Sequence, residues 1–186
     1  MKPPKSAFAA AARGLLELHD WDTPPWFAEL HWDGRVITFG VNVLLGFHPD
    51  QYPAVLIHRS KEAVEKQLEK NQRTLYGFAI MSEGYSVVSL PDASEEERRR
   101  FRRDRANRTF HQRPDAVENV FVYCADIYGQ VWSATEARNV PEAIGEDYFP
   151  ADRADVIVGG QLVTSLRAVA IAAGHFVHGL PAPRPS

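Results

Sequence analysis

The pair Asp33-Gly34 lies between two runs of residues that are typical of β-strands, WFAELHW and RVITFGVNV. Glycine accepts the positive φ that a tight hairpin turn requires, so this arrangement predicts a β-hairpin. Two later stretches show a similar arrangement: TLYGFAIMS and YSVVSL flank Glu83-Gly84, and VENVFVYCADI and QVWSATEAR flank Tyr128-Gly129. The sequence therefore predicts three hairpins, and with them an antiparallel sheet.

Helical patterns fill the gaps between the hairpins. We expect helices over residues 6–19, within 48–71 (clearest at 61–71, after Ser60 as N-cap), from Ser94 through the arginine-rich stretch, and over 159–174, closed by Gly174. The predicted fold class is α+β, with a single antiparallel sheet of about six strands built from three hairpins and packed by about four helices. Both alternating sets of side chains in 117–126 are largely apolar, which predicts that this strand lies in the middle of the sheet.

The totals favour one domain. The chain has 186 residues, is 45% hydrophobic and carries a net charge of −3, and a chain of this size buries enough surface to need no disulfide or metal for stability. We expect a disordered tail at 1–5, a single α+β domain at 6–178 and a Pro-rich tail at 179–186.

No apolar run approaches the roughly 20 residues of a membrane span, so we expect no membrane partner. The alanine-rich N-terminal stretch is interrupted by Arg13 and Glu17, which favours an amphipathic helix over a signal peptide. The single cysteine, Cys124, cannot form an intramolecular disulfide, and this fits a reducing compartment. We predict a cytoplasmic location.

Three segments carry short motifs: HDWDTPPW (19–26), SEGYSVVSLPDASEEERR (82–99) and RPDAVENVFVYCADIYGQVWSATEAR (113–138). They resemble a group of uncharacterised actinomycete proteins over about half of the chain. The matching positions are Trp21, Asp22, Pro24, Pro25, Glu83, Gly84, Tyr85, Pro114, Val117, Glu118, Asp126, Gly129 and Arg138. The resemblance implies an α+β fold but says nothing about activity, because the group has no established activity. This chain departs from the group in its first hairpin and in its density of arginine.

The stretch SEEERRRFRRDRANRTFHQRP (94–114) has eight arginines between 98 and 113 and one acid, Asp104, among them. A solvated helix explains much of this pattern. Ser94 and Glu97 have the spacing of a capping box, and the glutamates precede the arginines as the helix dipole favours.

An anionic partner is the other interpretation. On a helix, five of the arginines share an arc of about 160°, and guanidinium groups suit phosphates and carboxylates. The candidate anion-binding residues are Arg98, Arg99, Arg102, Arg103, Arg105 and Arg108. Nucleic acid is the first candidate partner and an acidic protein surface the second.

Other constellations are weaker. Cys124 lies within an apolar strand pattern and is predicted to be buried and unreactive. His175 and His178 have i,i+3 spacing but no identifiable further ligands, so we predict no metal site. Nothing in the sequence indicates a cofactor. The tryptophans of WDTPPW and Trp32 could form a recognition surface, although packing explains such a cluster better.

Three functions remain open, and the sequence favours a non-catalytic role. The first is a binding or accessory protein that uses the arginine-rich helix to meet an anionic partner. The second is a structural or assembly protein that acts through protein–protein contacts. The third is a small enzyme of unknown reaction with a site assembled from distant residues such as Glu83, Glu118, Asp126 and His111.

Overall fold

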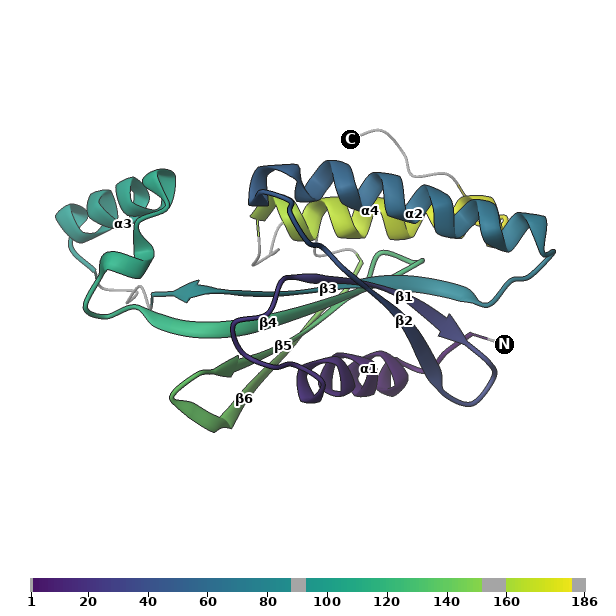
Figure 1. Ribbon diagram of the computed structural model, residues 1–186, viewed down its shortest axis with the longest axis horizontal. Helices are drawn as coiled ribbons and strands as arrows, with labels where there is room; N and C mark the ends of the chain where they lie inside the picture. Colours follow the sequence, from purple (N-terminus) through teal and green to yellow (C-terminus); the bar gives the residue numbers. More distant parts are fainter. Residues whose placement is uncertain (1, 88–92, 152–159, 182–186) are drawn as a thin grey trace.

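The computed structural model describes residues 2–87, 93–151 and 160–181, and these form an α+β fold with one six-stranded antiparallel sheet (Figure 1). In chain order the elements are α1 (Lys5–Glu17), β1 (Trp26–Trp32), β2 (Ile37–Val43), a 3-10 turn η1 (Pro49–Gln51), α2 (Tyr52–Glu69), β3 (Leu75–Ser86), α3 (Glu95–Asn107), a 3-10 turn η2 (Phe110–Gln112), β4 (Val117–Asp126), β5 (Val131–Ala137), β6 (Val140–Phe149) and α4 (Gly160–His178). The predicted fold class is confirmed.

The strands lie in the order β2-β1-β3-β4-β5-β6. β4 therefore has neighbours on both sides, as its apolar pattern predicts. Figure 1 shows α2 and α4 side by side on one face of the sheet and α1 on the other. The core is correspondingly split: Phe78 and Ile80 of β3 point to the α2–α4 side, whereas Ala79 and Met81 point to the α1 side.

The first and third predicted hairpins are present. Gly34 has φ +104 and Gly129 has φ +81, which only glycine adopts without strain. Asp33 Oδ1 accepts hydrogen bonds from the backbone N–H groups of Arg35 and Val36 at 2.7 and 2.8 Å. In the third hairpin, Asp126 Oδ1 accepts from the backbone N–H groups of Tyr128 and Gln130 at 2.9 and 2.8 Å, so each turn is held by an acidic side chain as well as by glycine.

The second predicted turn, at Glu83-Gly84, is wrong. Both residues lie inside the continuous strand β3, where Glu83 pairs with Val120 and Gly84 with Asn119 of β4. Residues 85 and 86 continue β3, and the rest of the expected strand to residue 90 falls largely outside the described residues. The sheet still contains three hairpins, formed by β1 with β2, β4 with β5, and β5 with β6.

Two helix boundaries also differ from the prediction. α2 begins at Tyr52 with a proline in its first turn, so Ser60 lies in mid-helix and donates to Ile57 O at 2.9 Å instead of acting as an N-cap. α4 continues through Gly174 to His178, and Gly179 follows it with φ +67. The segments 1 and 182–186 of the expected tails lie outside the described residues.

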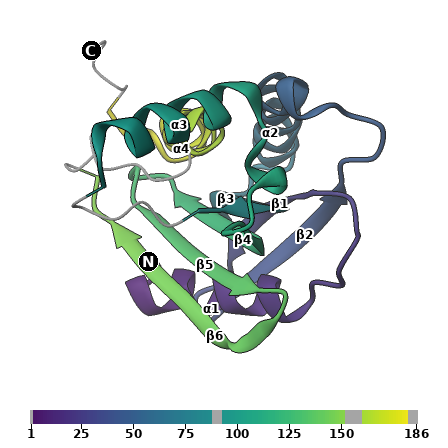
Figure 2. The same ribbon diagram turned by 90° about the vertical axis from the view of Figure 1, so that its left-hand side faces the viewer.

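β3 pairs with β4 over the whole length of β4, from Gly77 opposite Asp126 to Ser86 opposite Val117. α3 therefore lies in the segment of the chain that connects two paired central strands. Figure 1 shows α3 beyond the end of β3, and Figure 2 shows it on the side of the sheet where α2 and α4 lie, apart from α1. Among the described helices, none is long and apolar enough to cross a membrane.

Candidate functional site

The helix α3 begins with the predicted capping box. Ser94 N–H donates to Glu97 Oε2 at 2.6 Å, and Glu97 N–H donates to Ser94 Oγ at 3.2 Å. Two backbone donors that the first helical turn leaves unpaired are thereby satisfied. The capping box fixes where the helix starts and so which way its arginines point.

The inward face of α3 carries one ring and one buried acid. The ring of Phe101 packs against that of Phe110 in η2, with centroids 5.0 Å apart and the planes tilted by 45°. Asp104 is buried, and its carboxylate lies 3.7 Å from Arg100 Nε, 3.5 Å from Arg103 Nε and 3.3 Å from Arg113 Nη1. A buried carboxylate needs such partners, so part of the arginine content is structural.

The outward face carries Arg99, Arg102 and Arg103. At 100° per residue these three positions span about 100° of the helix, opposite Phe101 and Asp104. Their side chains are 75%, 63% and 68% exposed, respectively. We call them the arginine face.

Two acids on the helix compete for the arginine face, because Asp104 Oδ1 lies 3.5 Å from Arg103 Nε and Glu95 pairs with the other two arginines. Glu95 Oε1 accepts from Arg102 Nη2 at 2.8 Å and lies 3.7 Å from Arg99 Nε. Next to this face, Ser94, Glu96 and Arg100 contribute to a surface depression of about 410 Å³ that has both signs of charge on its walls. This surface therefore has more positive than negative groups, but it contains both.

The other predicted arginines differ. Arg108 follows the helix with φ +58, and its guanidinium is paired with both carboxylate oxygens of Asp50, which ties the end of α3 to η1. Arg98 lies on the same helix, and its N–H donates to Ser94 O at 3.0 Å. The side chain of Arg105 lies outside the described part of the structure. The structure thus brings three of the six candidates onto one exposed face and assigns Arg108 to a tether.

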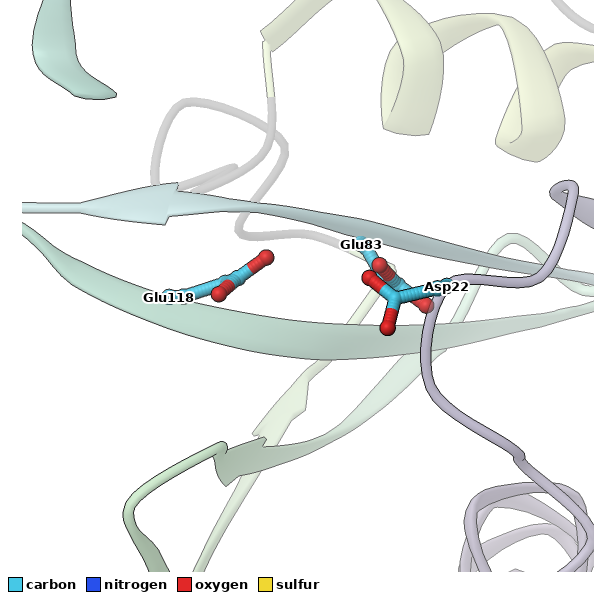
Figure 3. A group of neighbouring side chains, drawn as sticks. All are labelled: Asp22, Glu83 and Glu118. Atoms are coloured by element: carbon cyan, nitrogen blue, oxygen red, sulfur yellow. The ribbon is translucent and has the colours of Figure 1, made fainter.

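A second constellation lies on the α1 side of the sheet, and the sequence analysis named only two of its three residues, Glu83 and Glu118, as parts of one site. Carboxylate oxygens of Asp22, Glu83 and Glu118 lie within 4.8 Å of one another (Figure 3). They come from the loop before β1, from β3 and from β4, so the sheet register and the loop path together assemble them. Asp22 has φ +65, an uncommon backbone conformation for a residue with a side chain.

Arg138 neutralises part of this acidic cluster. Its Nη2 donates to Asp22 Oδ2 at 2.6 Å, and its Nη1 lies 3.2 Å from both carboxylate oxygens of Glu118. These bonds raise the pKa of Arg138, and its guanidinium holds the pKa of Asp22 below its usual range. The guanidinium carbon also stands 5.2 Å from the ring centroid of Trp21, a cation–π contact.

His19 lies behind Glu83. Its side chain is 4% exposed, and its Nε2 is 3.3 Å from Glu83 Oε1. Neither ring nitrogen makes a hydrogen bond with the described residues. Burial lowers the pKa of His19 because it penalises the charged ring.

Of the four residues named for an enzymatic site, the structure brings together Glu83 and Glu118 and not Asp126. Asp126 lies eight positions beyond Glu118 on β4, about 27 Å at 3.4 Å per residue. It holds the following turn, accepting hydrogen bonds from Gln130 N and Nε2 at 2.8 Å. The centroid of the His111 ring lies 6.0 Å from that of Tyr85, the residue opposite Glu118 on β3, and the two rings are tilted relative to each other.

The remaining predictions concern packing. Cys124 is completely buried, as expected, and burial raises the pKa of its thiol to about 12, which favours an unreactive side chain. Trp32 is buried, and Trp21 and Trp26 pack against the α1-side core. His178 Nε2 donates to Leu75 O at 2.7 Å, so this ring links α4 to β3.

Comparison of the chain with protein-family models, with curated proteins and with solved structures gave no match. Function has therefore to be argued from the two constellations themselves. Five residues of the short sequence motifs meet around the acidic cluster: Trp21, Asp22, Glu83, Glu118 and Arg138. These motifs, and the expectation that Glu83 and Glu118 belong to one site, are the sequence signals that point to it.

Proposed function

We propose that this protein is a non-catalytic binding protein whose α3 contacts the phosphate backbone of a nucleic acid. The observation that carries the proposal is the exposure of the arginine face, in which Arg99, Arg102 and Arg103 are each more than 60% exposed. Arginine forks bind phosphate oxygens in a bidentate manner. No base-reading motif accompanies them, so binding is expected to be largely independent of sequence.

Charge supports a modest affinity rather than a tight one. The segment 94–113 has eight arginines and four acids, a net charge of +4. The whole chain has a net charge of −3, so the rest of the chain carries −7. A phosphate backbone is attracted to α3 and repelled by much of the remaining surface. Three phosphate contacts would give a salt dependence with a slope of about −3 in log K against log salt for duplex DNA.

The test is a fluorescence anisotropy titration of labelled duplex and single-stranded DNA and RNA at low and at moderate salt. The variant R99Q/R102Q/R103Q should lose binding and flatten the slope. K61Q/K66Q/K70Q is the matched control, because it removes the same three charges from exposed positions of α2 and the residue that follows it. Absence of binding at low salt would remove nucleic acid and leave an acidic protein surface as the anionic partner.

A second candidate function, assembly through protein–protein contacts, has one observation in its favour. Between α2 and α4 lies an open apolar groove of about 430 Å³ whose walls include Ile57, Leu68 and Phe176. These three side chains are more than half exposed, and exposed apolar patches often mark interaction surfaces. Light scattering of the purified protein against concentration tests this alternative, with Phe176→Ser as the variant that should abolish any self-association.

A further inference from the structure

The acidic cluster of Asp22, Glu83 and Glu118 is the strongest feature that the arginine face does not use. Its three carboxylates come from segments 61 and 35 positions apart and converge to within 4.8 Å (Figure 3). Like charges at this separation repel one another, so the fold holds them together against that repulsion. An arrangement of this kind requires positive charge.

Arg138 supplies only one unit of that charge. The three carboxylates contribute −3 and the guanidinium +1, which leaves −2 on these four side chains. A divalent cation would bring the cluster to zero. Arg138 also leaves lone pairs for such an ion, because a carboxylate offers about four acceptor sites and Arg138 occupies one on each oxygen of Asp22 and of Glu118.

Glu83 is the carboxylate that Arg138 does not bridge in these contacts. Its Oε1 accepts from Thr23 N–H at 3.2 Å and lies 3.3 Å from His19 Nε2. Both contacts reach the same oxygen, and within the described part of the chain Oε2 remains available to a ligand. The loop of Asp22 and Thr23 thus positions Glu83 from one side while β3 positions it from the other.

His19 gives an independent indication that the cluster takes a ligand. It is a polar side chain with only 4% of its surface exposed, and it lies against Glu83, yet neither nitrogen is hydrogen-bonded within the described residues. Buried polar groups in native proteins are nearly always hydrogen-bonded. A hydrated ion on Glu83 would bring coordinated water toward this ring, and ligating carboxylates are commonly supported by such outer partners.

We propose that Asp22, Glu83 and Glu118 bind one hard divalent cation of the Mg²⁺ or Mn²⁺ class, with Arg138 and His19 as outer partners. Three carboxylates with room for water match the preference of these ions for oxygen ligands and retained hydration. The ligands are distant in sequence, which is why local spacing predicts no metal site. This proposal does not depend on the arginine face.

The test uses Mn²⁺ alone as the probe. Titration of the full-length protein, followed by the loss of the electron paramagnetic resonance signal of free Mn²⁺, should give one site per chain. Mg²⁺ should compete for it and raise the melting temperature. Glu83→Gln should weaken Mn²⁺ binding by at least about ten-fold, and Glu118→Gln should do the same. Glu65→Gln is the matched control, because it removes an exposed carboxylate of α2 that pairs only loosely with Lys61.

Melting curves in EDTA establish whether each variant is folded before its binding is interpreted. Should Glu83→Gln fail to fold, Glu118→Gln and Asp22→Asn carry the test, since Asp22 is the most exposed of the three. The proposal is overturned if the wild-type protein does not bind Mn²⁺ at millimolar concentration. It is equally overturned if the folded cluster variants bind Mn²⁺ as tightly as the wild type and Glu65→Gln do.

Discussion

Arg138 and Asp22 form a two-pronged ion pair across 116 positions of the chain, with Nη1 to Oδ1 at 3.0 Å and Nη2 to Oδ2 at 2.6 Å. The same guanidinium reaches Glu118 on the neighbouring strand, and the backbone N–H of Arg138 donates to Glu118 O at 3.0 Å. Arg138 therefore joins the end of β5 to β4 and to the loop that leads from α1 into β1.

Replacing Arg138 should destabilise the protein. Arg138→Gln leaves three carboxylates without their cation and removes the contact with Trp21, and we expect the melting temperature to fall by roughly 2–6 °C. Arg138→Lys keeps the charge but cannot form the fork, so its loss should be smaller. Arg35→Gln, on an exposed turn, is the control. Equal melting temperatures for Arg138→Gln and Arg35→Gln would show that the ion pair contributes nothing to stability.

The close approach of β3 to the end of β4 makes a second prediction. A Cβ placed on Gly77 would lie 2.3 Å from Ala125 O, whereas one placed on Gly40 of β2 meets nothing within 4 Å. Gly77→Ala should therefore cost at least about 2 kcal/mol in the free energy of unfolding, because two central strands would have to separate. Gly40→Ala should be close to neutral. Urea denaturation of the two variants measures both values, and equal values would contradict the packing described.

The hairpin pattern predicted the fold class because turn chemistry is local. Asp33-Gly34 reports its turn directly, since the side chain and the positive φ both act within four residues. Glu83-Gly84 is also an acidic residue followed by glycine, but it lies in the middle of a strand. There a Cβ on Gly84 would lie 3.4 Å from the Phe121 ring, and Glu83 belongs to the acidic cluster. Tertiary context decided between turn and strand there, and the local sequence does not contain that context.

β6 was missed for a related reason. Its sequence, VPEAIGEDYF, is rich in residues that are depleted in strands. Among the strands that the structure describes, β6 pairs only with β5, and edge positions tolerate proline and charge and even favour them.

The sequence groups the arginines of α3 on one helical arc, whereas it names only two residues of the acidic cluster, Glu83 and Glu118, together. Arg99, Arg102 and Arg103 fall on one helix, so the 100° periodicity is enough to group them. Asp22, Glu83 and Glu118 are grouped only by the pairing of β3 with β4 and by the path of the loop before β1. Sequence spacing alone cannot supply such long-range geometry.

The ring of His178 predicts how stability depends on pH. Burial lowers its pKa, and this effect outweighs the Leu75 carbonyl, which favours the charged ring; Arg73 lowers the pKa further. The unfolded chain therefore binds a proton at a higher pH than the folded protein does. Stability from this residue is present above the ordinary pKa of about 6.5 and is lost as the pH falls below it.

His178→Gln should accordingly reduce the loss of stability between neutral and mildly acidic pH. Urea midpoints at both pH values for the wild type and the variant provide the measurement. Part of the dependence should remain, because burial also lowers the pKa of His19. His58→Gln, on the exposed face of α2, serves as the control. A pH dependence that is unchanged in His178→Gln but altered in His58→Gln would contradict this assignment.

Glu95 pairs with the arginine face, so replacing it distinguishes a binding surface from a merely solvated helix. The quantity that decides is the direction of the change in DNA affinity. Glu95 holds Arg102 at 2.8 Å and lies 3.7 Å from Arg99, so a phosphate must compete with its carboxylate. Glu95→Gln frees both guanidinium groups. If they bind phosphates, affinity for duplex DNA should increase by about two- to five-fold, the upper range of an exposed ion pair.

Glu96→Gln is the matched control for this experiment. It removes the same charge from the same helical turn, so it reports the change in net charge without the release of Arg99 and Arg102. The gain for Glu95→Gln should exceed that for Glu96→Gln at every salt concentration, and anisotropy titrations on one duplex measure both. Equal gains would mean that only net charge matters, and a loss of affinity in Glu95→Gln would place the binding surface elsewhere on the molecule.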